Sequence, residues 1–193
     1  MFKSTKIIEL GSCAFRQPQA KSHCQFLHGY RLTGKFWFEA NELDENNWVV
    51  DFGALKGLKQ LLEKQFDHTT CISSSDPHIE TFKKLEKLGV CDLRIMDGGV
   101  GIEKFAEFCY KAADNFVDEL TDGRCKCIMV EVFEHEKNSA IYQTHTTQKI
   151  VYKEPEVETV IPPVKDTSRA APVGNKKQTN KWIDPDSTNS WGI

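Results

Sequence analysis

Hydrophobic and polar residues alternate most regularly near the start of the chain. Residues 6–16 are rich in Ile, Leu, Cys and Phe with few strand-breaking residues, and residues 30–40 alternate between apolar and mostly polar positions. A period of two is typical of a strand with one buried face. Turn-forming residues follow at 41–47, and the Trp-Val-Val sequence at 48–50 is expected to continue the sheet.

Two later segments repeat apolar residues with the spacing of an α-helix. Residues 54–66 place leucines on one helical face, and Asp51 just upstream is a suitable cap. Residues 102–120 carry a longer apolar stripe, and the glycine-rich stretch at 98–101 marks its start. Both segments are therefore predicted to be helices whose apolar faces pack against a sheet.

Shorter segments complete the expected order of elements. A short helix is predicted at 78–88 and a strand at 92–96, while 124–133 and 140–146 are predicted to pair as two strands. Without the two short segments at 78–88 and 92–96, the order is strand-strand-helix-helix-strand-strand, which is typical of an α+β domain. We expect a four-stranded antiparallel sheet with two helices on one face.

The composition changes after Gln143. Five of the seven prolines fall beyond this residue, in a stretch that shows neither helical nor strand periodicity. The sequence therefore predicts a folded domain at 1–143 and a Pro-rich tail at 144–193 that is mostly disordered or bound to a partner. Trp182 and Trp191 lie among polar residues, so the tail either anchors on a partner protein or is solvated with incidental aromatic residues.

Charge and cysteine content exclude several classes of protein. The net charge is −3, which provides no general basic surface for a phosphate backbone, so direct nucleic-acid binding is not expected. No apolar run approaches the roughly 20 residues of a membrane span, and the first residues lack the apolar core of a secretory signal. Seven cysteines without a Cys-x-x-Cys pair indicate neither a disulfide framework nor a four-cysteine zinc site. We expect a cytoplasmic protein without a membrane segment.

Three groups of side chains are suited to proton transfer or ligand binding. Cys24 and His28 place a thiol and an imidazole four residues apart, and a nearby base or positive charge activates a thiol. Asp67 precedes His68 at the end of the first predicted helix, where a carboxylate can orient an imidazole. Glu134 ends a predicted strand. Each group also has an explanation without function. The spacing of Cys24 and His28 can be a coincidence, Asp67 and His68 can form a helix cap or a surface turn, and Glu134 can be a solvated carboxylate.

In this order and spacing, the groups resemble the 6-pyruvoyltetrahydropterin synthase and 6-carboxytetrahydropterin synthase family, which shares the tunnelling architecture, or T-fold. The resemblance spans residues 5–143. The matching segments are Cys24-Gln-Phe-Leu-His28-Gly29, Asp51-Phe52-Gly-Ala-Leu55-Lys56, Phe66-Asp67-His68, Gly101-Ile102-Glu103 and Phe133-Glu134. The Pro-Thr pair that precedes the glutamate at 103 in the family is missing from this sequence.

The resemblance implies a role for each matching residue. Cys24 corresponds to the thiolate that moves protons on the substrate side chain, and Asp67 and His68 correspond to the pair that relays protons beside it. Glu134 corresponds to the carboxylate that binds the guanidine-like edge of a pterin, where two parallel charge-assisted hydrogen bonds fit. Glu103 is implied as a second substrate-binding residue.

The family binds zinc through three histidines, and the sequence departs from that pattern. The positions correspond to Phe15, His28 and Tyr30, so His28 is the remaining metal ligand. Catalytic zinc needs three protein ligands. Either the chain binds no zinc at the family position, or a rebuilt site uses Cys13 and His23 together with His28.

Three functions follow from the resemblance. The first is a lyase acting on dihydroneopterin triphosphate, in queuosine or pterin biosynthesis. The second is an altered enzyme that acts on another pterin or purine without zinc. The third is an inactive T-fold pterin-binding or scaffold protein whose tail engages a protein partner. In each case the resemblance implies a ring-forming homo-oligomer, a trimer or hexamer, with active sites between subunits.

Overall fold

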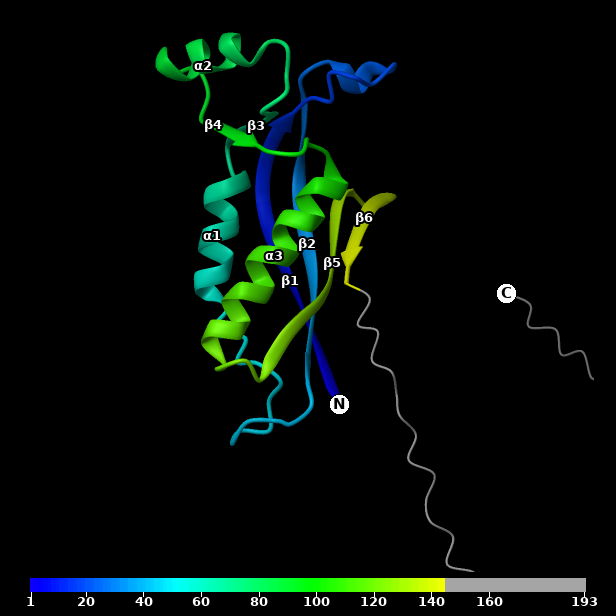
Figure 1. Ribbon diagram of the computed structural model, residues 1–193, viewed down its shortest axis with the longest axis vertical. Coiled ribbons are helices and arrows are strands. Elements are labelled where there is room, and N and C mark those ends of the chain that lie inside the picture. Colours follow the sequence, from blue (N-terminus) through cyan, green and yellow to red (C-terminus); the bar gives the residue numbers. More distant parts are fainter. Residues whose placement is uncertain (145–193) are drawn as a thin grey trace, which may run out of the picture. The chain divides into compact units, whose positions relative to one another are not determined.

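A mixed sheet of six strands forms the framework of the fold, with the strand order β4-β3-β1-β2-β5-β6 (Figure 1). The structure is a computed structural model that describes residues 1–144. The strands are β1 (Phe2–Phe15), β2 (His28–Ala40), β3 (Thr69–Ser73), β4 (Leu93–Met96), β5 (Cys125–His135) and β6 (Asn138–Gln143). The helices are α1 (Lys56–Phe66), α2 (Ile79–Lys87) and α3 (Ile102–Leu120), and a short 3₁₀ turn, η1 (His23–Gln25), lies between β1 and β2.

The sheet has an antiparallel part and a parallel part. β1 pairs with β2, β2 with β5 and β5 with β6 in antiparallel fashion, whereas β3 runs parallel to both β1 and β4. The α+β class is confirmed, but the prediction of four antiparallel strands was wrong. β3 was not foreseen because all five of its residues are buried, so it lacks the alternation by which a half-buried strand is recognised.

Helices α1 and α3 pack on the same face of the sheet, while α2 lies at one end, beside β3 and β4 (Figure 1). In β2 the alternation predicted from the sequence is confirmed, because every second residue from Leu32 to Ala40 is buried. Phe36 and Phe38 are fully buried there, and burial of one such side chain contributes about 1.5–3 kcal/mol. The helices contribute Leu58, Leu62, Phe66, Phe105, Ala106, Cys109, Ala113 and Val117 to the same core.

The segment between β2 and α1 differs from the prediction. Residues 48–50 do not continue the sheet. The helix begins at Lys56, and the Asp51 carboxylate accepts a hydrogen bond from the Gly53 amide at 2.7 Å, so it stabilises a turn rather than capping the helix. Leu61, assigned from the sequence to the buried helical face, is 44% exposed.

The tail predicted at 144–193 lies almost entirely outside the described residues, and with it the proposed partner contacts of Trp182 and Trp191. Within residues 1–144, none of the helices combines the length and the apolar character needed to cross a membrane.

Candidate functional site

The Asp67–His68 pair is clamped against β1 at the end of α1. The Ser12 amide donates a hydrogen bond to Asp67 Oδ1 at 3.0 Å, and the His68 amide donates to the Ser12 carbonyl at 2.8 Å. His68 Nδ1 lies 3.0 Å from the same Asp67 oxygen. This geometry fits an imidazole whose Nδ1 carries the proton, which leaves Nε2 as the basic nitrogen. The sequence prediction that this carboxylate orients the imidazole agrees with these contacts.

The contacts with Ser12 and His68 also favour the ionised form of the Asp67 carboxylate. The hydrogen bond from the Ser12 amide, followed by the interaction with His68, lowers the pKa of Asp67 below its ordinary value. The His68 side chain is 86% exposed, so its free nitrogen is open to a ligand. An ionised aspartate behind an accessible imidazole is an arrangement suited to general-base catalysis.

A β-bulge in β1 makes room for this pair. The pairing register between β1 and β2 shifts between Glu9 and Gly11, and Gly11 has a φ of +97°. A Cβ atom on Gly11 would lie 2.2 Å from Asp67 Oδ1. The bulge therefore requires glycine at position 11. The sequence contains this glycine, but its role becomes visible only when the fold brings it against Asp67, 56 positions further along the chain.

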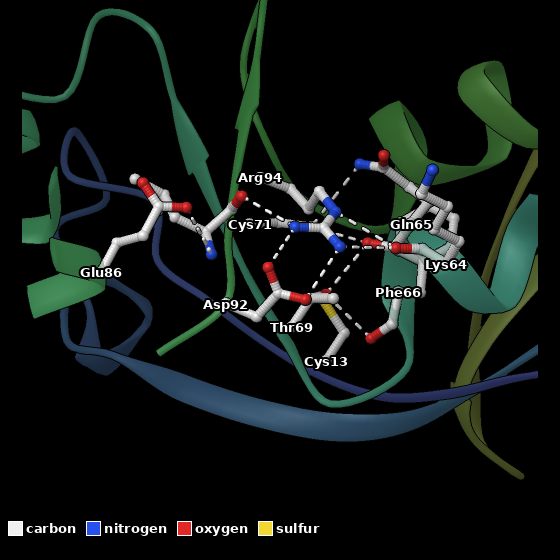
Figure 2. A network of polar contacts seen from close by, with 10 residues as sticks. Cys13, Lys64, Gln65, Phe66, Thr69, Cys71, Glu86, Asp92 and Arg94 are labelled. Atoms are coloured by element: carbon white, nitrogen blue, oxygen red, sulfur yellow. Dashed lines mark hydrogen bonds and ion pairs between the residues drawn. The ribbon is translucent and has the colours of Figure 1, made fainter. Parts of the chain in front are cut away.

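Behind the pair, a network of polar contacts fixes the end of α1 (Figure 2). The Thr69 hydroxyl donates to the Phe66 carbonyl at 2.9 Å. The Arg94 guanidinium donates to the Lys64 carbonyl at 2.9 and 3.1 Å and pairs with Asp92. These contacts satisfy carbonyls that the helix end leaves free, so they hold the segment that carries Asp67 and His68.

Cys24 lies in a different part of the chain. It sits in the turn η1, where its amide contacts the Ser22 hydroxyl at 3.4 Å and its carbonyl accepts from the Gln17 amide at 2.9 Å. The side chain is half-buried. Within residues 1–144 no hydrogen bond joins its thiol to His68, and Cys24 is not among the residues around the pocket at His68. Among the described residues of one chain, the structure therefore shows neither a hydrogen bond nor a shared pocket for these two predicted catalytic residues.

Glu134 occupies a second bulge, in the hairpin between β5 and β6. The pairing register shifts between Phe133 and His135, and the Glu134 side chain is half-buried at the shift. His135, which the sequence did not single out, has its ring centroid 6.1 Å from that of Tyr30. Glu134 therefore directly precedes a residue whose ring lies near Tyr30, one of the positions that correspond to the family's metal ligands. Glu103, by contrast, is exposed in the first turn of α3 and has no hydrogen-bond partner among residues 1–144.

At the family's metal position the structure places three rings on one face of the β1–β2 hairpin. Phe15 pairs with His28 across the hairpin, and Tyr30 lies two residues further along on the same face. The Phe15 ring centroid is 4.6 Å from that of His28 and 6.2 Å from that of Tyr30. The ring centroids of His28 and Tyr30 are 5.7 Å apart.

These residues do not fit zinc. Phe15 has no donor atom, and His28 Nδ1 already contacts the Phe26 carbonyl at 2.8 Å, so one imidazole nitrogen remains. The alternative zinc ligands expected from the sequence are Cys13 and His23 together with His28. Of these, Cys13 is buried, and its sulfur lies 3.8 Å from the Thr69 hydroxyl. Across residues 1–144 no group of three or more His, Cys, Asp or Glu side chains is arranged to hold a metal ion.

Comparison with known sequences identifies relatives. The sequence profile of the 6-pyruvoyl tetrahydropterin synthase family matches residues 9–145. The 6-carboxy-5,6,7,8-tetrahydropterin synthase of Rickettsia bellii is 35% identical over 80 residues, which are 41% of this chain and 57% of that protein. The chain therefore spans little more than half the length of this curated relative.

Solved structures share the fold. An uncharacterised protein from Wolinella succinogenes superimposes with a TM-score of 0.65 at 17% identity, over 74% of this chain and 98% of that chain. The 6-pyruvoyl tetrahydropterin synthase of Plasmodium vivax gives a TM-score of 0.54 at 16% identity, over 75% of this chain and 99% of that chain. At these identities the structural likeness establishes the fold, and the family profile covers most of the sequence. The chain therefore belongs to the 6-pyruvoyl tetrahydropterin synthase family.

Proposed function

We propose that this protein is a lyase of the 6-pyruvoyl/6-carboxytetrahydropterin synthase type that acts on a reduced pterin. Dihydroneopterin triphosphate, in queuosine or pterin biosynthesis, is the substrate to test first. The observation that carries the proposal is the clamped Asp67–His68 pair, in which an ionised carboxylate orients an accessible imidazole. A protein that served only as a scaffold would have no need for this arrangement.

The residues divide into a ring-binding group and a proton-transfer group. Glu134 accepts two parallel hydrogen bonds from the N–H edge of the pterin. His68 Nε2 takes a proton from the substrate side chain, and Asp67 stabilises the imidazolium that results. Cys24 is the thiol that exchanges a proton on the other side of the substrate.

Replacing Glu134 with glutamine is expected to weaken pterin binding by roughly one and a half to three decades. The charged pairing contributes on the order of 2–4 kcal/mol, because the variant leaves ring donors unpaired and presents a donor to them. Titration calorimetry with a reduced pterin measures the change. Glu136→Gln, an exposed carboxylate in the same hairpin, is the matched control and should leave the affinity unchanged. Equal affinities for wild type and Glu134→Gln would remove Glu134 from the site.

The lack of a hydrogen bond between Cys24 and His68 within residues 1–144 supports a site that is shared between subunits of a homo-oligomer. The sheet face opposite α1 and α3 carries exposed apolar side chains such as Ile7 and Ile141, which favour burial against another copy. A trimer or hexamer in which one copy supplies Cys24 and its neighbour supplies Asp67 and His68 would complete the proton-transfer group.

Mixing two inactive variants tests this arrangement. Cys24→Ala and His68→Ala are each expected to abolish turnover, while an oligomer reassembled from equal amounts of both should regain about a quarter to a third of the wild-type rate, because a fraction of the interfaces then pairs two intact halves. Turnover of dihydroneopterin triphosphate is the readout. A mixture as inactive as its components, with mixed oligomers verified by mass, would place both residues in the site of one chain.

The rings at the metal position favour a second candidate, an altered enzyme or a non-catalytic pterin-binding protein. Phe15 and Tyr30 replace two of the three family ligands, which favours chemistry without zinc. Pterin binding without turnover would select the non-catalytic protein. A scaffold that engages a partner through its tail is expected to bind no pterin at all.

A further inference from the structure

A continuous run of aromatic rings leads from the protein core to the surface at the candidate site. The Phe15 ring packs edge-on against Phe105 in the core at a centroid distance of 5.1 Å. From Phe15 the run continues through His28 and Tyr30 to His135, with centroid distances of 4.6, 5.7 and 6.1 Å. The solvent-exposed fraction of the residues rises along this run. Phe15 is 1% exposed, His28 and Tyr30 are half-buried, and His135 is exposed.

Phe15, His28 and Tyr30 of this run stand at the positions that correspond to the zinc ligands of the family. A zinc ion needs ligand nitrogens or oxygens at about 2.0–2.2 Å on several sides. The Phe15 ring fills one of those sides with carbon and is held there by Phe105, so it cannot rotate away without opening the core. Half-buried rings with polar tips instead provide a surface on which a flat heterocycle can stack.

We propose that this site holds its ligand without a metal, through stacking on the exposed part of the run, a hydrogen bond accepted by His28 Nε2 and a hydrogen bond donated by the Tyr30 hydroxyl. The identity of the ligand as a pterin rests on the proposed function. Without a metal–oxygen bond, side-chain hydroxyls of the ligand contribute little to binding. The site therefore selects for the planar ring itself, and a vicinal diol on the side chain is not a requirement.

Metal content provides the first test. After dialysis against zinc and then buffer, the wild-type protein should retain far less than one zinc per chain by elemental analysis. The variant Phe15→His/Tyr30→His, which restores three histidines, should retain about one zinc per chain. The matched control Phe15→Leu/Tyr30→Phe changes the same positions without adding ligands. Stoichiometric zinc in the wild-type protein that disappears in a His28→Ala variant would overturn the proposal.

Ligand selectivity provides the second test and does not depend on the folding of the histidine variant. Dihydroneopterin, which carries hydroxyls on its side chain, and 7,8-dihydropterin, which lacks the side chain, should bind the wild type within about threefold of each other, since hydroxyls exchanged from water to protein contribute little net affinity. A chelator should leave both affinities unchanged. Tyr30→Ala should weaken both by about tenfold through loss of stacking. A diol preference above about thirtyfold that a chelator abolishes would contradict the proposal.

The two proposals fail in different ways. If no pterin binds, the proposed function is wrong, while the zinc content still decides whether the ring run excludes a metal. If pterin binds only with stoichiometric zinc, the proposed function stands and the metal-free site is wrong.

Discussion

Replacing Asp76 with asparagine is expected to lower the free energy of unfolding by about 3–5 kcal/mol, the usual cost of removing one partner of a buried ion pair. The Asp76 side chain is completely buried, and its Oδ2 lies 3.4 Å from Arg16 Nε, with neither atom hydrogen-bonded elsewhere within residues 1–144. The pair joins the residue after β1 to the loop that follows β3. The variant leaves the guanidinium, 18% exposed, without a counter-charge.

Urea denaturation followed by circular dichroism measures the loss. Glu80→Gln is the matched control, because Glu80 forms a surface pair with Lys83 and such pairs contribute about 0–1 kcal/mol. The double variant Arg16→Met/Asp76→Leu removes both charges and should regain part of the stability. A loss for Asp76→Asn no larger than that for Glu80→Gln would mean that the pair is effectively solvated.

The parts of the fold that could be predicted are those whose pattern is local. The alternation in residues 30–40 and the apolar stripe at 102–120 correspond to β2 and α3, because each buries one face against the core. The mixed sheet could not be predicted in this way. β3 is buried along its whole length, and its pairing with β1 covers only residues 13–15 and 69–71, which no local periodicity reveals.

The same distinction between local and long-range features applies to the candidate site. Asp67 and His68 are neighbours in sequence, so their interaction could be predicted, whereas the Ser12 amide that fixes them comes from a strand 55 residues away. The run of rings that ends at His135 could not be predicted either. Phe15 contacts His28, and Tyr30 contacts His135, only because the strands that carry them pair in the sheet. The resemblance to the family named individual residues, but it could not say which of them contact one another within one chain.

Gly11→Ala is expected to destabilise the protein by about 3 kcal/mol and to disturb the Asp67–His68 pair. A side chain at φ +97° strains the backbone by about 1–3 kcal/mol, and forcing a methyl group into occupied space adds a similar amount. The new Cβ would lie 2.2–2.4 Å from three atoms of Asp67, its Cβ included, so the whole side chain must move. That movement breaks the hydrogen bond from the Ser12 amide.

The charge of Asp67 provides a readout that a loss of stability alone would not change. The Ser12 amide lowers the pKa of this carboxyl, so the contact stabilises the folded protein at neutral pH and is lost as the pH falls through the folded-state pKa. In Gly11→Ala the pKa should therefore rise toward its ordinary value of 3.8, as measured by carboxyl ¹³C NMR titration.

Two controls separate backbone strain from overlap with Asp67. Gly89 also has a positive φ, +71°, but a Cβ there would meet nothing within 4 Å, so Gly89→Ala should cost only about 1–2 kcal/mol. In an Asp67→Gly background the obstructing Cβ is gone, so adding Gly11→Ala should cost no more than the backbone strain. If Gly11→Ala costs the same with and without the Asp67 side chain, and the carboxyl pKa of the single variant does not move, then the bulge does not position the pair.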